Sequence, residues 1–328
     1  MWEEFTKAWE NDARKLWVIN VGDIKPMEIG IDYFSKMAWN IHQMRSDSQP
    51  LFLRSFSEKH FGKTFAKPVS ALLGEYYRLG TIRKPEEMNR DWALSLSINR
   101  AEQLKRDYKK LLNNEKELVK AIPSEIHDSY FELVGFSAKI MGFTGLLFLA
   151  DRDGLLSGDT IKSNQEVTNL YSYIQKQVDY YNHNIANGKW NYMMPYETYK
   201  DLPEWYSLVS WPWGEKSKSI DHSKLQFNRI WRAASSADSV SSLNNVKWVE
   251  VDGLGSTGKA LVLKPATLSS SWSLGDYSAP SLNYKFKTNG NEEDVLIDFL
   301  PTFRICYGYK LRVAFRVDNL PAECIEIP

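Results

Sequence analysis

Near its start the chain has three successive sequence patterns within about thirty residues: an apolar run, a polar stretch and a run with helical spacing. Four apolar residues at 16–19, Leu-Trp-Val-Ile, predict a buried strand. Residues 20–28 then bring in Asn, Gly, Asp, Lys, Pro and Glu, which are typical of a polar loop. Apolar residues recur at helical spacing directly afterwards, at Ile31, Phe34, Met37, Ala38 and Ile41. The sequence therefore predicts one strand–loop–helix unit at the start of the chain.

This unit is a candidate corner of an active site. In α/β barrels the catalytic side chains lie on the loops that follow the strands, and this loop carries Asn20, Asp23, Lys25 and Glu28. The competing interpretation is a polar connection in which Asp23 caps a local backbone group. A single unit cannot close a barrel, so the functional interpretation requires further barrel strands upstream of this sequence.

Length and charge narrow the class of protein. A chain of 328 residues predicts two or three domains. Lys and Arg equal Asp and Glu at 41 each, which argues against nucleic acid or an anionic membrane as partner. No apolar run reaches the ~18 residues that span a bilayer, and the acidic start at residues 1–4 shows no signal peptide. The 12 Trp and 17 Tyr favour sugar binding, because flat rings stack on pyranose faces.

The middle of the chain predicts a bundle of helices. Apolar residues recur at helical spacing over residues 69–77, 92–112, 127–150 and 167–185. The second helix is expected to start near Pro85 and to run unbroken to Leu112. One face of the third predicted helix carries small residues, which predicts close contact with another helix: Gly135, Ala138, Gly142 and Gly145. The fourth is expected to end at Asn187-Gly188.

The pattern changes after the helices. Residues 201–245 lose periodicity and are rich in Trp and Ser, which indicates a linker that packs across domains. Short β-rich runs follow at 246–251, 259–263, 282–288, 295–300 and 309–317, typical of an all-β, sandwich-like domain that is incomplete at residue 328. The predicted fold is multidomain α+β. It comprises the last βα unit of a TIM-type barrel at 1–48, a helical bundle at 49–200, the linker, and the β domain at 246–328.

Two further stretches allow a functional and a structural interpretation. Residues 253–258 fit the dinucleotide pattern G-x-G-x-x-G, but the residues that follow read as a strand, so a glycine-rich turn is expected instead. Residues 187–194 contain Trp190 and favour a packed loop over a sugar-facing platform.

No cofactor or metal site is expected. None of the histidines forms a helical i, i+4 pair with another, and no cysteine lies near them: His42, His60, His127, His183 and His222. Cys306 and Cys324 could form a disulfide or remain two reduced thiols.

The opening loop carries a family resemblance. Asn20-Val21-Gly22-Asp23-Ile24-Lys25-Pro26-Met27-Glu28 resembles the N-V-G-D-[LI]-K-P-x-E signature of glycoside hydrolase family 115. Later stretches match the family in the same order: Arg83–Glu86, Phe131–Val134, Tyr181-Asn182 with Gly188–Met194, and Trp248 with Gly253–Gly258. The resemblance covers nearly the whole chain.

The resemblance implies an α-glucuronidase that releases glucuronic acid, or its 4-O-methyl ether, from xylan side chains. Such enzymes combine an N-terminal α/β domain, a TIM barrel, a helical bundle and a C-terminal β domain. This sequence then begins at the last barrel strand and is a fragment, inactive by itself, of a secreted or periplasmic parent. The acid and base carboxylates would lie upstream.

The resemblance also suggests roles for the opening loop. Asn20 is expected to touch the uronic acid and Lys25 to face its carboxylate, while Asp23 or Glu28 positions them or acts as a catalytic carboxylate. The expected partner is glucuronoxylan or a glucuronoxylo-oligosaccharide, and the bundle and β domain could mediate homodimer contacts. The alternative function is that of a non-catalytic accessory module that binds polysaccharide or another subunit.

Overall fold

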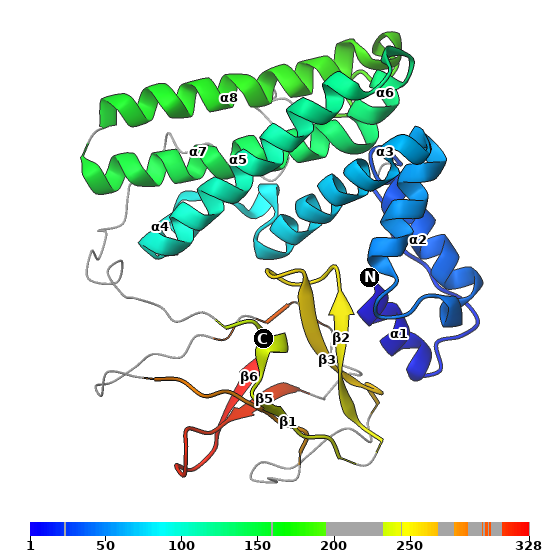
Figure 1. The fold of residues 1–328 in the computed structure, drawn as a ribbon, viewed down its shortest axis with the longest axis vertical. Helices are drawn as coiled ribbons and strands as arrows, with labels where there is room; N and C mark the ends of the chain where they lie inside the picture. Colours follow the sequence, from blue (N-terminus) through cyan, green and yellow to red (C-terminus); the bar gives the residue numbers. More distant parts are fainter. Residues whose placement is uncertain are drawn as a thin grey trace. The chain divides into compact units, whose positions relative to one another are not determined.

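The computed structural model describes residues 1–22, 24–158, 160–194, 232–243, 245–267, 279–287, 297, 299–300, 302 and 310–327. The chain divides into two compact units. The mixed unit comprises Met1–Val21, Ile31–Gln49 and Arg232–Pro328, and the helical unit comprises Gly22–Gly30 and Pro50–Trp231. The protein is therefore a mainly helical α+β chain in which each unit combines segments that are distant in the sequence (Figure 1).

The helical unit is built from long helices that lie side by side. Helix α7 packs against both α5 and α8 (Figure 1). The fully buried side chains of the helical unit include Tyr108, Phe148 and Tyr181. The elements of this unit are α3 (Gln49–Ile82), η2 (Pro85–Glu87), α4 (Arg90–Ser95), α5 (Ile98–Ala121), η3 (Ser124–Ile126), α6 (His127–Tyr130), the π-helical turn η4 (Phe131–Gly135), α7 (Phe136–Ser157), α8 (Thr160–His183) and η5 (Ile185–Gly188).

The small face of α7 makes the close helix contact that the sequence predicts. A Cβ atom added at Gly142 would lie 2.5 Å from Cγ of Leu112, and one added at Gly145 would lie 2.5 Å from Cζ of Tyr108. Leu112 and Tyr108 both belong to α5. The two glycines therefore allow α5 and α7 to approach more closely than any larger residue would permit.

The prediction of one helix from Pro85 to Leu112 is wrong, because two side-chain caps divide the stretch. The side chain of Asn89 accepts a hydrogen bond from the amide of Trp92 at 2.8 Å and starts α4. The hydroxyl of Ser97 accepts one from the amide of Arg100 at 3.3 Å and starts α5. Each cap satisfies an amide that the start of a helix leaves without a partner, so a new helix begins although the apolar spacing continues.

The third predicted helix is a continuous helical run that contains the π turn. The run from Ser124 to Ser157 is long and apolar enough to cross a membrane, but 78% of its most apolar window is buried within the protein. All five residues of the π turn are buried. The run therefore has the surroundings of a core helix. The last helix, α8, ends at His183, and η5 continues the turn to Gly188, which has a left-handed φ of 74°.

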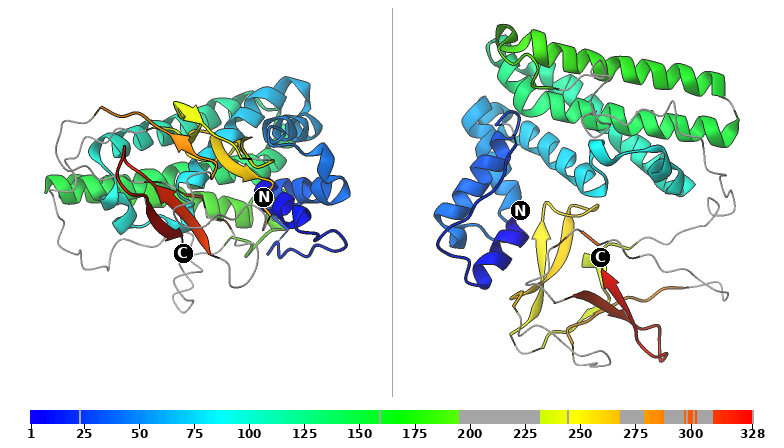
Figure 2. Two further views of the ribbon diagram at one scale, coloured as in Figure 1. Left: turned by 90° about the horizontal axis from the view of Figure 1, so that it is seen from below. Right: turned by 180° about the vertical axis from the view of Figure 1, so that it is seen from behind.

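The mixed unit joins the two ends of the chain. Lys264 Nζ contacts Glu10 Oε2 at 3.2 Å, and the amide of Ala266 donates to the same oxygen at 2.9 Å. Strands β2 and β3 therefore lie beside α1 (Figure 2). The elements of this unit are α1 (Trp2–Glu10), α2 (Glu28–Trp39, whose first turn belongs to the helical unit), η1 (Ile41–Gln43), η8 (Ala234–Ser236), β1 (Ser239–Val240), β2 (Lys247–Asp252), β3 (Lys259–Lys264), β4 (Leu282–Asn283), β5 (Leu311–Phe315) and β6 (Glu323–Ile327).

The described strands form three antiparallel pairs, β1 with β4, β2 with β3, and β5 with β6. The predicted strands at 246–251, 259–263 and 309–317 correspond to β2, β3 and β5, whereas β6 was not predicted. Half of the predicted strand at 295–300 and most of the linker at 201–245 lie outside the described residues. The predicted glycine-rich turn is confirmed, since Gly253 and Gly258 close a hairpin loop between β2 and β3.

The predicted buried strand at residues 16–19 is not found. The segment is extended without strand pairing, and Leu16 and Val18 are 79% and 84% exposed. A strand needs a neighbour for its backbone N–H and C=O groups, and none of the described strand pairs includes this segment. Trp17 holds it by ring contacts with Phe5 and Phe34. The helix predicted next to it is confirmed as α2.

Candidate functional site

Three charged side chains meet in the helical unit. Two of them come from the stretch Asn20–Glu28, which we call the opening motif. Lys25 Nζ forms an ion pair with Glu28 Oε1 and another, at 2.9 Å, with Glu132 Oε2. The side chains of Lys25 and Glu28 are each 24% exposed, and that of Glu132 is 8% exposed. We call these three residues the carboxylate–lysine cluster. It joins segments that are 107 residues apart in the sequence.

Local structure explains how these groups are presented. Glu28 is the first residue of α2, where the positive end of the helix dipole favours a carboxylate. Lys25 lies three residues earlier in the preceding turn, which places its ammonium beside Glu28. Glu132 belongs to the π turn between α6 and α7. Single π-helical turns inside helices occur frequently at functional sites.

The charges of the cluster affect one another. Burial, and then the negative charge of Glu28, raise the pKa of Glu132 to about 7 although Lys25 opposes the shift. Burial by itself would lower the pKa of Lys25, but its hydrogen bonds to Glu28 and Glu132 outweigh this and raise it. A lysine that stays charged beside one carboxylate and one protonated carboxyl group makes the cluster neutral. The arrangement is therefore suited to holding a proton on Glu132 below neutral pH.

Three buried oxygens of this region form no hydrogen bond of ordinary geometry with any described residue: Glu28 Oε2, Glu132 Oε1 and Tyr181 Oη. Tyr181 comes from α8, and burial together with the charges of Glu132 and Glu28 raises the pKa of its hydroxyl. Buried polar groups are nearly always satisfied. Because its pKa is raised, Tyr181 keeps its proton, and its hydroxyl is a potential donor to these carboxylate oxygens.

The loop after α8 brings an aromatic ring to the same place. Lys25 Nζ lies 5.3 Å from the ring centroid of Trp190, and Lys189 Nζ lies 4.7 Å from it. The loop is held by Asn182, whose side chain exchanges two hydrogen bonds with the backbone of Met194 at 2.9 and 3.0 Å. Trp190 is partly buried. It therefore has packing and cation–π contacts of the kind expected for a packed loop.

Of the four site residues predicted from the sequence, Lys25 and Glu28 lie together in the structure. Lys25 also pairs with Glu132, which was not among the predicted site residues. The one signal for Glu132 is a carboxylate within the apolar run Phe131–Val134. Asn20 is exposed and belongs to the mixed unit, and Asp23 lies outside the described residues.

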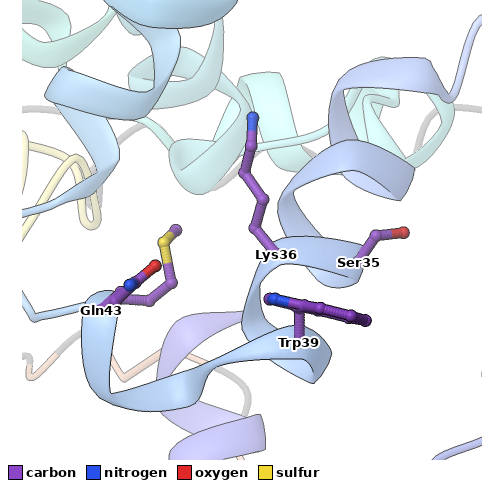
Figure 3. Close-up of a pocket in the computed structure, with 5 residues that line it drawn as sticks. Ser35, Lys36, Trp39 and Gln43 are labelled. Atoms are coloured by element: carbon purple, nitrogen blue, oxygen red, sulfur yellow. The ribbon is translucent and has the colours of Figure 1, made fainter.

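The mixed unit carries a shallow pocket of about 340 Å³. Ser35, Lys36 and Trp39 project from α2, and Gln43 faces them from η1 (Figure 3). Trp39 is 92% exposed. Lys36 is paired with Asp32 at 2.7 Å and the hydroxyl of Ser35 donates to a backbone carbonyl of α2 at 2.8 Å, so the exposed ring of Trp39 is what this pocket offers a sugar residue.

No group of three or more potential metal ligands occurs among the residues that the structure describes. Cys324 is exposed and free, and Cys306 lies outside that part of the chain.

Comparison with known proteins gives concordant results for the two ends of the chain. Residues 1–87 match the family model for glycosyl hydrolase family 115, and residues 231–327 match the model for the family 115 C-terminal domain. A search of the curated proteins finds no match. A solved structure is similar with a TM-score of 0.61 and 24% identity: a "family GH115 4-O-methyl-alpha-glucuronidase, BtGH115A, with specificity for decorated arabinogalactans". The alignment covers 79% of this chain and 34% of that one, so the chain spans about a third of its neighbour's length.

Proposed function

The chain belongs to glycoside hydrolase family 115, and we propose that it forms part of an α-glucuronidase that removes glucuronic acid, or its 4-O-methyl ether, from xylan side chains. The observation that carries the proposal is the match of two models from one family, in order, to residues 1–87 and 231–327. The carboxylate–lysine cluster supports it, because Lys25 and Glu28 come from the opening motif.

We further propose that these 328 residues act within a longer enzyme. The chain spans 34% of the solved relative. Leu16 and Val18 are adjacent-but-one aliphatic side chains that are exposed here, and a further layer of packed structure would bury them. Glycoside hydrolysis needs a proton donor and a second carboxylate that activates water or attacks the sugar. In this proposal both come from strands upstream.

The opening loop would then position the substrate. Asn20 is proposed to hydrogen-bond the uronic acid, with Asp23 or Glu28 in support. Contact between Lys25 and the sugar carboxylate would require the ammonium to exchange one of its two protein carboxylates for that of the sugar. Such positioning contributes to the rate because misplaced reacting atoms lose the advantage of proximity.

The polymer to which the uronic acid is attached has two candidates. The family resemblance suggests xylan, whereas the solved relative has specificity for decorated arabinogalactans. The two polymers share the terminal uronic acid and differ in the sugar that carries it. An assay of both substrates separates them, since the same product is released.

The function is tested by measuring release of uronic acid from both polymers. The proteins to compare are this chain and the product of the longest reading frame that contains it. We expect turnover from the longer product and none from the chain alone, because an α/β barrel needs about eight strands. Turnover of ~1 per second or more by the chain alone would show that its own carboxylates suffice, and Glu28 and Asp23 would be tested first.

The alternative is a non-catalytic module that binds polysaccharide. The observation in its favour is the exposed Trp39 beside Lys36 and Gln43. Xylan binding by this chain that is lost in Trp39→Ala, together with no turnover by the longer product, would support the module instead of the enzyme.

A further inference from the structure

Among the residues that the structure describes, Glu132 is a buried carboxylate whose cationic partner is Lys25. It lies in the π turn near the start of the helical run Ser124–Ser157, and Lys25 belongs to the segment 24–30, which contains most of the opening motif. Its contact with Lys25 joins this segment to the helices of the same unit. Within the opening motif, Glu28 contacts the same ammonium.

We propose that Glu132 is a positioning residue, which with Glu28 holds the Lys25 ammonium and thereby fixes the segment 24–30 on the helical unit. Its importance for catalysis rests on the proposed function, because it assumes that the loop carrying Asn20 faces a substrate. The contact itself does not depend on that function.

The charges of Lys25, Glu28 and Glu132 make the contact between the segment 24–30 and the helices sensitive to pH. Within the described part of the chain, the groups that face Glu132 are Lys25 and Glu28 from the segment 24–30 and Tyr181 from α8. Lys139 on α7 pairs with Glu115. One ammonium can compensate one carboxylate, so the arrangement is most favourable when a proton resides on the Glu28–Glu132 pair. Burial raises the pKa of Glu132 to about 7, and loss of its proton above that pH leaves two buried carboxylates for one ammonium.

The buried oxygens of the cluster support this distribution of the proton. Glu132 Oε1 and Glu28 Oε2 are acceptors without a hydrogen-bond donor of ordinary geometry among the described residues. A proton on either carboxyl group converts an acceptor into a donor and reduces the number of unsatisfied acceptors. A purely packing role for Glu132 would not depend on pH in this way.

The test is hydrogen exchange of this chain, followed by mass spectrometry of peptides that cover residues 24–30. In the wild type, protection of this segment should fall by about tenfold or more between pH 5 and pH 8, after correction for intrinsic exchange. The reason is that Glu132 binds its proton more tightly when the segment is docked than when it is detached, so loss of the proton at higher pH favours detachment of the segment. Glu132→Gln should keep the protection seen at pH 5 and lose its pH dependence. Glu132→Ala should lower protection at both pH values.

The matched control is Glu115→Gln, which removes a second buried carboxylate from the same unit but one that pairs with Lys139. It should leave the exchange of residues 24–30 unchanged. The inference is overturned if Glu132→Ala does not loosen the segment, if Glu132→Gln retains the pH dependence, or if Glu115→Gln loosens the segment equally. Should the alanine variant fail to fold, the pH series of wild type and Glu132→Gln decides. No substrate is used, so failure of the proposed glucuronidase function would not affect the outcome.

Discussion

The close contact between α5 and α7 predicts that replacing a glycine by alanine destabilises the protein at that contact and stabilises it elsewhere in a helix. Replacing Gly145 with Ala removes backbone freedom from the unfolded chain and should by itself stabilise a helix by about 0.5–1 kcal/mol. The added Cβ would lie 2.5 Å from Cζ of Tyr108, whose side chain is fully buried. Overpacking of this kind costs about 1–3 kcal/mol. Three atoms of this buried ring would lie within 2.7 Å of the added Cβ, so we expect a cost in the upper part of that range, about 2–3 kcal/mol. After the gain is subtracted, Gly145→Ala should lower the free energy of unfolding by about 1–2.5 kcal/mol.

The matched variant is Gly74→Ala in α3, where an added Cβ meets nothing within 4 Å. This change should stabilise the helical unit by about 0.5–1 kcal/mol, because only the backbone term applies. Urea unfolding followed by circular dichroism at 222 nm measures both variants against the wild type. The reasoning is refuted if Gly145→Ala is as stable as the wild type, or if the two variants shift the midpoint in the same direction.

Three further predictions follow from individual contacts. Because the pKa of Glu132 is raised, its contribution to stability is complete below about pH 4.5 and is lost as the pH rises through about 7. Between these pH values the unfolding free energy of the wild type should fall, relative to that of Glu132→Gln, by up to about 3 kcal/mol. Urea titrations at several pH values would measure this difference. Gly255→Ala should destabilise the β2–β3 hairpin by about 1 kcal/mol or more, because φ is +80° and the Cβ would lie 3.0 Å from the carbonyl oxygen of Lys259; proteolysis of the hairpin would report this, and calorimetry should detect no binding of NAD or ATP. Ser97→Ala should cost about 1 kcal/mol through loss of the α5 cap, and an unchanged urea midpoint would contradict it.

The sequence predicted best where one local rule decides the structure. Glycines at Gly142 and Gly145 recur on one face of a helix and indicate a close neighbour. Glycines at 253–258 between two β-rich runs indicate a hairpin turn. Neither inference needs a distant partner to be identified.

The predictions failed where a second rule competed with the first. Apolar spacing continued through Ser97, but a side-chain cap restarted the helix there. Apolar residues at 16–19 favoured a strand, but a strand also needs a pairing neighbour, and none of the described strands provides one. Glu132 was missed as a site residue because its significance comes from Lys25, which is 107 residues away in the sequence.

The most direct test of the central claim is a kinetic comparison of the longer reading-frame product with its Asn20→Ala variant. The measurement is release of glucuronic acid or its 4-O-methyl ether from glucuronoxylan. The account predicts turnover by the parent and a lower kcat/KM for the variant, with loss of one hydrogen bond to the substrate costing roughly 0.5–1.5 kcal/mol and more if it tightens in the transition state. It also predicts a nearly unchanged melting temperature, because the role proposed for Asn20 is contact with the substrate. No release of uronic acid from any glucuronosyl polymer, or identical kinetics of parent and variant, would contradict it.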